Sequence, residues 1–321
     1  MLIFRSLQEI PPGYGPSIVT IGNFDGVHRG HQSVLAELTM RARTRIARAI
    51  AVTFEPHPVR ILRPLQPLQL ITPFAQKLEL LRATGLDAVL VLPFTPQLSQ
   101  LSAMEFAQDV LRGALHAIEV HEGENFRFGR DACANVDTLA SLGAQLGFTV
   151  HAHPARIWRG IPISSSTIRT VIQQGNMRSA RQLLGRAFAI QSTPAQGRGY
   201  GARYTVPTIN LAAYTELLPA NGVYVTCMQV AGESFEAITN VGNRPTFGAD
   251  SFAVESHLLN FHPIALEATT PLTLHFLDRI RAETRWPSPE ALKAQIGRDA
   301  AYARHYFAVW KAQRSPQTQN L

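Results

Sequence analysis

Cysteine is scarce in this chain: Cys133 and Cys227 are the two that occur among 321 residues. A disulfide framework or a cysteine-based zinc site needs several cysteines at short, regular spacings, so the sequence excludes both. We interpret the two thiols as buried or incidental groups of a protein in the reducing cytoplasm.

Long apolar runs are also missing. Nowhere do about 18 apolar residues follow one another, which excludes a membrane-spanning helix. The first residues, MLIFRSLQEIPPGYGPS, contain no long apolar segment and no small-residue cleavage site, so we expect no signal peptide. The sequence therefore favours a cytoplasmic protein without a membrane partner, and no obligate protein partner is evident.

The charged residues form no run of one sign, although 30 Lys and Arg outnumber 23 Asp and Glu and give a net charge of +7. A positive excess favours anionic partners, namely nucleic acid, a membrane surface or small phosphorylated molecules. Because the arginines are scattered and not interleaved with aromatic residues, the sequence favours small phosphates and no nucleic-acid partner is expected. A hydrophobic content of 45% suits a globular protein of two domains or one large one.

Up to about residue 185, strand-like and helix-like segments alternate. Strands are expected within 17–24, 49–54, 87–94, 116–126 and 147–155. The expected helix after the first strand would bury a row made of Val34, Leu38, Ala42 and Ile46. A later helix opens with Ser102 and Glu105 at the spacing of a capping box. This alternation is typical of an α/β fold with a doubly wound parallel sheet.

Beyond residue 187 the pattern changes to short strands separated by Gly, Pro and Asn turns. We expect them within 187–195, 206–212, 222–230, 234–242, 252–261 and 271–281, followed by a helix over 288–310. An antiparallel β-barrel or sandwich is typical of such a pattern. A short helix within 173–186 would join the halves, so we predict domains at 1–182 and 183–321.

The stretch GNFDGVHRGH, residues 22–31, follows the first predicted strand and runs into a helix. Ligands of open α/β sheets bind at such strand ends, and a helix N-terminus offers N–H groups and partial positive charge to phosphate. His28 and His31 would face the same side, and Gly30 would let a polyphosphate approach the backbone. Groups placed there can stabilise the charge that develops during nucleotidyl transfer.

Plainer interpretations of these residues are a glycine turn with two surface histidines, or a zinc pair. Zinc takes three or four ligands, and no third ligand stands at a useful spacing, so the sequence disfavours a metal here.

Three further stretches would lie near the same strand ends. PISSSTIR, residues 162–169, opens a helix with hydroxyls that can cap N–H groups or bind phosphate, and it carries Arg169 as a possible phosphate clamp. TFEPHP (53–58) and EGENFRFG (122–129) each follow a predicted strand. Each could be a structural turn or N-cap alone, but four such stretches together favour one site.

In this order and spacing, TIGNFDGVHRGH, TFEPHP, GENFRFG and ISSSTIR resemble the amino-terminal half of bacterial bifunctional riboflavin kinase/FAD synthetases. The resemblance implies an FMN adenylyltransferase that makes FAD from FMN and ATP and releases pyrophosphate, with His28 and His31 as catalytic residues at the ATP phosphates. The ATP-binding residues that it implies are Gly22, Asn23, Phe24, Asp25, Gly30, Ser164, Ser165 and Arg169. The flavin-binding residues that it implies are His57, Pro58 and Asn125. Ser166 stands where the family usually has threonine and keeps the hydroxyl.

VPTINL, NVGNRPTFG and VESHLLNF resemble the riboflavin kinase half of the same family, which implies ATP-dependent phosphorylation of riboflavin to FMN. The resemblance implies that Thr208 and Asn210 bind Mg²⁺ and the ATP phosphates, and that Glu255 takes the proton from the ribityl hydroxyl. Oxygen ligands suit Mg²⁺, and a carboxylate near a hydroxyl can act as a general base. From the residues alone, Thr208 and Asn210 could equally be turn residues and Glu255 a solvated strand residue.

The kinase half departs from the family pattern at two places. Thr205 and Val206 replace the usual glycine and phenylalanine, and Ile209 replaces the usual alanine. A side chain at position 205 would narrow the approach of ATP if the glycine serves close contact. An enzyme that only adenylylates FMN, with 187–321 as a flavin-binding module, is therefore an open alternative, and a nucleic-acid-binding protein is a disfavoured one.

Overall fold

The computed structural model describes residues 1–195, 208–243, 252–262, 264 and 266–313, so Thr205 and Val206 lie outside the described residues. The chain divides into two compact units, Met1–Thr167 and Ile168–Leu321. The domain boundary expected at 182/183 stays a prediction.

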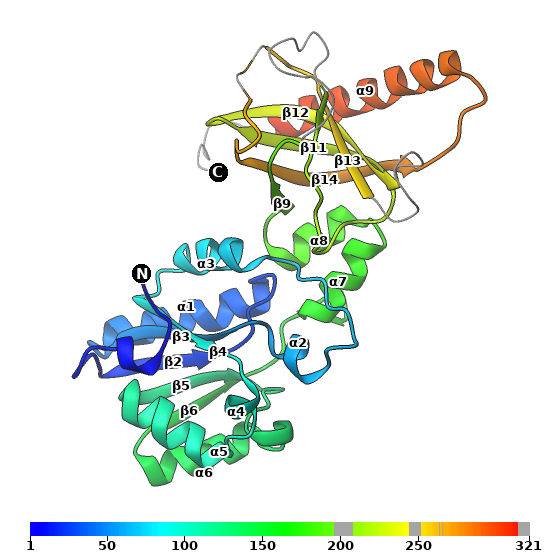
Figure 1. Cartoon of the computed structure of the whole chain (residues 1–321). Coiled ribbons are helices and arrows are strands. Elements are labelled where there is room, and N and C mark those ends of the chain that lie inside the picture. Colours follow the sequence, from blue (N-terminus) through cyan, green and yellow to red (C-terminus); the bar gives the residue numbers. More distant parts are fainter. Residues whose placement is uncertain (196–207, 244–251, 263, 265, 314–321) are drawn as a thin grey trace. The chain divides into compact units, whose positions relative to one another are not determined.

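The first unit is built on a six-stranded sheet with the order β1–β4–β3–β2–β5–β6, in which every neighbouring pair is parallel (Figure 1). Its strands are Leu2–Phe4 (β1), Ser17–Ile21 (β2), Arg48–Glu55 (β3), Ala88–Pro93 (β4), Ala117–Gly123 (β5) and Thr149–His153 (β6). The expected parallel sheet is confirmed, and β1 adds a strand that the sequence pattern does not predict.

Helices cover both faces of this sheet. One face packs against α1 (Arg29–Thr44) and α3 (Phe74–Arg82). The other face packs against α5 (Ala103–Glu105), the π-helical η2 (Phe106–Ala114) and α6 (Val136–Leu146). Short elements complete the unit: η1 (Leu7–Glu9), α2 (Pro58–Leu62), α4 (Pro96–Ser99), η3 (Arg130–Ala132), β7 (Ile157–Trp158) and β8 (Ile161–Pro162). The unit is therefore doubly wound, and the capping box of Ser102 and Glu105 is confirmed.

The buried face of α1 differs from the expected row. The helix buries Leu35, Leu38, Thr39 and Ala42. Val34 is half-buried, and Ile46 is 91% exposed because it lies beyond the end of the helix. A row of four-residue steps drifts around a helix by about 40° at each step, so it cannot stay on one buried face for three steps.

The strand order places a topological switch between β2 and β5. From β2 the chain proceeds through β3 to β4 on one side, and then returns to β5 on the other side of β2. Ligands of open α/β sheets bind in the crevice at the carboxyl ends of the strands beside such a switch. The loops that follow Ile21 and Gly123 emerge there, so both belong to the candidate site.

The second unit is an antiparallel sheet with the order β10–β13–β12–β11–β14–β9. Its strands are Phe188–Ser192 (β9), Thr208–Asn210 (β10), Gly222–Val230 (β11), Glu233–Asn243 (β12), Phe252–Leu258 (β13) and Leu272–Ala282 (β14). Just beyond the two edge strands, Pro194 and Leu211 form an antiparallel bridge. The sheet therefore curls into a half-barrel, as the pattern of short strands predicts.

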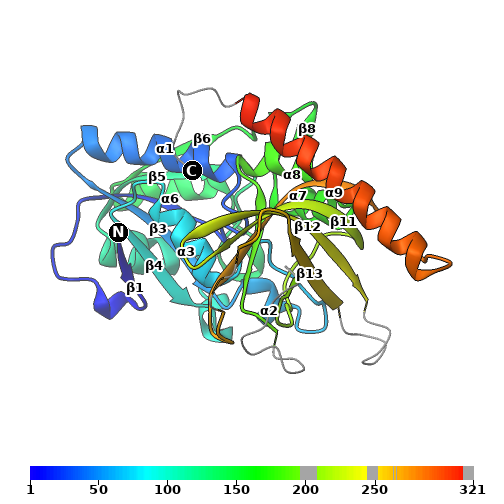
Figure 2. The same ribbon diagram turned by 90° about the horizontal axis from the view of Figure 1, so that it is seen from above.

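Three helices accompany this sheet in sequence. Helix α7 (Ser165–Gln173) precedes α8 (Met177–Leu184), and α9 (Pro289–Ala312) begins at the expected N-cap, Ser288. Figure 2 shows α9 along one face of the sheet, where Phe307 belongs to the same core cluster as Val225. No helix in the described part of the chain is long and apolar enough to cross a membrane.

Candidate active sites

The histidine pair lies at the N-terminus of α1, directly after β2. His28 is the N-cap, and its Nδ1 accepts a hydrogen bond from the backbone N–H of His31 at 3.3 Å. The two imidazole rings stack with centroids 3.6 Å apart and planes inclined by 16°. The structure therefore brings the two sequence-predicted catalytic residues together at a helix N-terminus.

Burial determines the protonation state of His31. Burial, with a further contribution from His28, holds the pKa of His31 well below its usual 6.5, so the ring is neutral near pH 7. Its Nδ1 is buried and has no hydrogen-bond partner among the described residues. A buried polar atom of this kind is uncommon in proteins and is consistent with a ligand that completes it.

Gly30 has a structural reason to be glycine. A Cβ atom there would lie 3.1 Å from both Cε1 and Nδ1 of His28 and 3.4 Å from the carbonyl oxygen of Ile163. The missing side chain therefore makes room for the His28 ring. The expected role of Gly30 in admitting a polyphosphate stays a prediction.

Asp25 fixes the loop of the first motif. Its carboxylate is buried, and Oδ1 accepts hydrogen bonds from the backbone N–H groups of Ile71 at 2.9 Å and Thr72 at 3.0 Å. The N–H of Gly26 donates to the Thr72 hydroxyl at 3.0 Å. These contacts hold the motif against the segment between α2 and α3, a connection that sequence spacing does not reveal.

The serine-rich motif is tied to the same loop. The Ser165 hydroxyl donates to the carbonyl oxygen of Asp25 at 2.8 Å. Ser164 accepts the backbone N–H of Thr167 at 3.2 Å and so caps the start of α7. Arg169 follows Ser165 by four residues and lies on the same side of α7. The first and last motifs of the predicted site therefore meet at Asp25 and Ser165.

A pocket opens beside the motif and contains three sequence-predicted residues. It is lined by Asn23, Asp25, Glu55, His57, Leu70, Thr72, Phe74 and Lys77. Nδ1 of His57 accepts the N–H of Val59 at 3.2 Å, and Pro58 occupies the first turn of α2. Asn125 lies exposed in the loop after β5, outside this lining.

Gly22 and Phe24 shape the loop around the pocket. Phe24 is buried with a φ of 49°, and a Cβ atom on Gly22 would meet its ring at 3.2–3.3 Å. The ring of Phe24 therefore packs directly against Gly22, which leaves little room for a side chain at position 22.

Lys77 is a site residue that sequence reasoning misses. Its side chain is buried, and Nζ donates to the carbonyl oxygen of Asn23 at 3.3 Å, the Thr53 hydroxyl at 3.2 Å and the carbonyl oxygen of Phe54 at 3.4 Å. Burial lowers the pKa of Lys77, whereas the nearby Glu55 and Asp25 raise it. The sequence signal that could reveal this residue is a lysine on the buried face of α3, three residues after Phe74.

The second candidate site lies on β10 and β13. Asn210 pairs with Glu255 and Thr208 pairs with His257 in the strand register, so all four side chains lie on one face. Val254, Ser256 and Leu258 are buried on the other face. The strands therefore bring together the three sequence-predicted kinase residues.

His257 is a further residue of this site. Its Nδ1 lies 3.2 Å from the hydroxyl oxygen of Thr208. Burial, with a contribution from the positive charge of Arg304, lowers the pKa of His257. Ile209 is buried and points away from this face, so the family departure at 209 does not face the candidate ligands.

Comparison with protein families gives two matches. Residues 12–167 match the family described as FAD synthetase, and residues 184–307 match the family described as riboflavin kinase. The second match supports the kinase half over the alternative of an enzyme that only adenylylates FMN.

Similar proteins agree with both matches. Bifunctional riboflavin kinase/FMN adenylyltransferase of Pseudomonas fluorescens is 35% identical over 95% of this chain and 97% of its own. The protein of that description from Escherichia coli K12 is 32% identical over 92% of this chain and 94% of its own. A solved structure titled macrolide-efflux protein, from Streptococcus pneumoniae, has a TM-score of 0.84 at 26% identity over 94% of this chain and 98% of its own.

Both halves of the chain thus match in sequence, and the fold of each agrees with the expectation drawn from the motifs. The chain belongs to the bifunctional riboflavin kinase/FMN adenylyltransferases, enzymes that use ATP to make FMN from riboflavin and FAD from FMN.

Proposed function

We propose that FAD forms around His28 and His31 and that FMN forms around Thr208, Asn210 and Glu255, at two separate sites. The observation that carries this assignment is the stacked imidazole pair on the N-terminus of α1, beside the β2/β5 switch, in which His28 is buried. Phosphates bind well at such a terminus, and the partnerless Nδ1 of His31, among the described residues, supports a ligand there.

In the adenylylation step, a phosphate oxygen of FMN attacks the α-phosphorus of ATP. A new O–P bond forms, the bond to the β-phosphate oxygen breaks, and pyrophosphate leaves. The attacking phosphate is already anionic, so no general base is needed and the protein mainly has to stabilise charge. His28, His31 and the N–H groups of α1 would do this, and Ser164, Ser165 and Arg169 would hold the triphosphate.

The pocket beside the motif supports a place for the flavin. His57 and Asn23 line it, and Pro58 fixes the backbone turn next to it. In this assignment His57, Pro58 and Asn125 contact FMN, whereas Asn23 and Asp25 belong to the loop that binds ATP.

In the phosphorylation step, Glu255 would accept the proton of the ribityl hydroxyl, whose oxygen then attacks the γ-phosphorus of ATP as the bond to ADP breaks. Thr208 and Asn210 lie on the same face as Glu255 and offer the oxygen donors that Mg²⁺ prefers. When bound, Mg²⁺ would neutralise phosphate charge. His257 is a suitable acceptor for the Thr208 hydroxyl proton, which would leave the oxygen lone pairs of Thr208 available.

The remaining assignments concern location and partners. A cytoplasmic location is supported by two cysteines that are both free in the described structure. The flavins and ATP are the proposed partners, and the net charge of +7 suits their phosphates.

The test is to replace His28 or His31 by alanine and to measure both reactions separately. Loss of one transition-state donor costs roughly a hundredfold or more, so FAD formation from FMN should fall by that factor while FMN formation from riboflavin stays at the parental rate. His305→Ala, an exposed position of α9, is the matched control and should leave both rates unchanged. Equal loss of both reactions in a folded His31→Ala variant would contradict the two-site assignment.

A further inference from the structure

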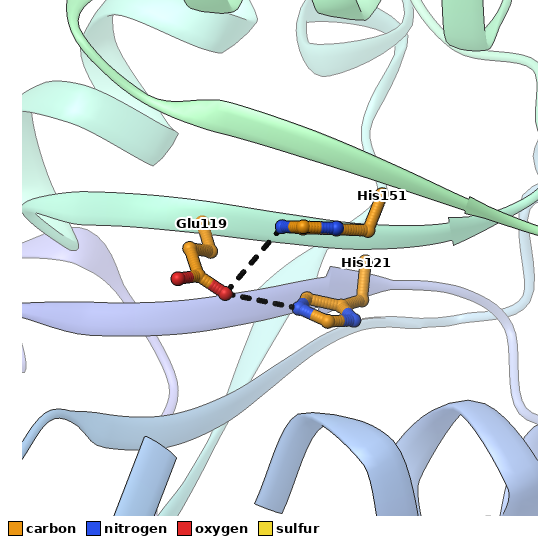
Figure 3. Close-up of side chains that lie close together, drawn as sticks. All are labelled: Glu119, His121 and His151. Carbon is orange, nitrogen blue, oxygen red and sulfur yellow. Dashed lines mark hydrogen bonds and ion pairs between the residues drawn. The ribbon is translucent and has the colours of Figure 1, made fainter. Parts of the chain in front are cut away.

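A second cluster of titratable side chains lies in the first unit, outside the residues assigned to either reaction. Glu119 and His121 are two residues apart on β5, and His151 lies opposite His121 on the neighbouring strand β6 (Figure 3). The three side chains therefore project from the same face of the sheet. Strand β6 is at the edge of that sheet, and the side chain of His151 is 42% exposed.

The three side chains converge on a single oxygen atom. Oε2 of Glu119 lies 3.4 Å from Nε2 of His121 and 3.5 Å from Nε2 of His151. All three potential ligand atoms lie within 4.8 Å of one another. A tetrahedral ion with bonds of about 2.0–2.1 Å holds its ligand atoms about 3.3–3.4 Å apart, so this spacing is close to that of a metal site.

Neighbouring groups orient the cluster. Nδ1 of His121 lies 3.0 Å from Nε2 of His153, and such a contact at the second ring nitrogen fixes the orientation of a ligating histidine. Nη2 of Arg41 donates to Oε1 of Glu119 at 2.7 Å, which holds the carboxylate in place. Nε of Arg41 also donates to Oε2 at 3.0 Å, so a bound cation would share this oxygen with the guanidinium, which limits its affinity.

We propose that Glu119, His121 and His151 form a binding site for a divalent transition metal ion of the zinc class, with the remaining coordination position taken by water on the exposed side of His151. Two nitrogen donors out of three favour such an ion over Mg²⁺, which prefers oxygen. The ion would cross-link the edge strand β6 to β5. Because it would bind the folded first unit and not the unfolded chain, it should stabilise the folded state by mass action.

The test uses the full-length protein, freed of metal with a chelator and titrated with Zn²⁺ against a chromophoric competitor. The parent should bind one equivalent at this site, and His151→Ala should lose it, since His151 is exposed and its removal leaves the core intact. His262→Ala is the matched control, because His262 is an exposed histidine of the second unit that pairs with Glu233 at 3.0 Å. His31→Ala tests whether the stacked histidine pair at α1 binds the ion instead. Both His262→Ala and His31→Ala should still bind one equivalent of Zn²⁺.

Two further measurements identify the ligands. Co²⁺ in place of Zn²⁺ should give the visible absorption of a four-coordinate ion in the parent and not in His151→Ala. His153→Ala should retain the stoichiometry and weaken binding by roughly tenfold or more, as expected for a group that orients a ligand. The proposal is wrong if His151→Ala binds Zn²⁺ like the parent, if His31→Ala removes the equivalent, or if Mg²⁺ in equal amount displaces it.

Discussion

At the scale of single residues, His31 and His257 belong to different candidate sites, and burial lowers the pKa of both imidazoles. Each ring is therefore neutral near pH 7 and carries one N–H and one acceptor nitrogen. At His31 the buried Nδ1 has no partner among the described residues, whereas Nδ1 of His257 faces the Thr208 hydroxyl. The same side chain is thus suited to contact a ligand in one site and to orient a neighbouring side chain in the other.

Glu255→Gln tests the proposed base of the kinase site. The amide keeps the shape of the side chain and its place opposite Asn210, but it cannot accept the proton of the ribityl hydroxyl. General-base assistance typically contributes roughly a hundred- to ten-thousandfold, so FMN formation should fall within that range while riboflavin still binds and FAD formation continues. Steady-state rates of both reactions measure this. Glu233→Gln, on an exposed residue of β12, is the control, and parental FMN formation by Glu255→Gln would exclude Glu255 as the base.

Lys77→Met tests a positioning residue that the sequence does not reveal. Methionine fills a similar volume but leaves the carbonyl oxygens of Asn23 and Phe54 without their shared donor, so the pocket loop should loosen. We expect the KM for FMN in the adenylylation reaction to rise by roughly tenfold, with FMN formation from riboflavin unchanged. Lys293→Met, on an exposed residue of α9, should change neither quantity. An unchanged KM in Lys77→Met would show that the three hydrogen bonds do not position the pocket.

At the scale of elements, the switch between β2 and β5 is held by a side chain. Beyond the paired residues Val19 and Val120, the carboxyl group of Glu122 accepts the backbone N–H of Ile21 at 2.5 Å. Burial raises the pKa of Glu122 well above its usual value, against the effect of hydrogen bonds from Ile21 and Thr20. Burial therefore favours the neutral form of this carboxyl group at the point where the two strands diverge toward the candidate site.

Glu122→Gln should stabilise the first unit near neutral pH. In the parent, the unfolded chain releases the Glu122 proton above about pH 4.5 while the folded chain retains it, so parental stability declines as pH rises from 4.5 to the raised folded pKa. Glutamine accepts the same hydrogen bond and does not titrate, so the gain should be small near pH 4.5 and reach a few degrees in melting temperature at higher pH.

The measurement is the FAD-forming activity that remains after heating at several pH values, because this activity reports on the first unit. Glu124→Gln, on an exposed neighbour, should give no pH-dependent difference from the parent. A Glu122→Gln variant that is less stable than the parent at pH 8 would show that the carboxyl group contributes more than its neutral hydrogen bond.

The sequence predicts most of the elements and the main motifs, since alternation, capping boxes and strand-end glycines are local signals. The row from Val34 to Ile46 fails because an apolar spacing says nothing about where a helix ends. The contacts of Asp25 with residues 71 and 72 and the burial of Lys77 join segments some fifty residues apart, which one sequence cannot pair. The motifs thus predict which segments carry the site, and the structure supplies what holds them together.

At the scale of the whole molecule, the two family matches leave residues 168–183 between them, whereas the two compact units follow one another directly. The matched ranges end at 167 and resume at 184, and the units meet between Thr167 and Ile168. Helix α7 begins at Ser165 and continues through Arg169, so a cut after 167 would separate two proposed phosphate ligands that share one helix. This favours the predicted boundary near 182 for the catalytic function of the first unit.

The boundary can be tested with fragments. Fragment 1–182 keeps Ser165 and Arg169 on an intact α7 and should form FAD from FMN, whereas the rate of this reaction in fragment 1–167 should fall by roughly a hundredfold or more.

Fragment 183–321 should form FMN, but its melting temperature should be lower than that of fragment 175–321. The reason is that α8 buries Met177 and Ala180, and its Arg178 pairs with Asp278 of β14. Removing Arg178 leaves the carboxylate of Asp278 without this cation, although the backbone N–H of Arg279 at 3.0 Å and the hydroxyl of Tyr302 at 3.2 Å still donate to it. Limited proteolysis of the full chain should cut first within 176–188, and the masses of the products would identify the position of the cut. If 183–321 shows no cooperative melt, or if 1–167 forms FAD as fast as 1–182, the boundary at 182/183 is wrong.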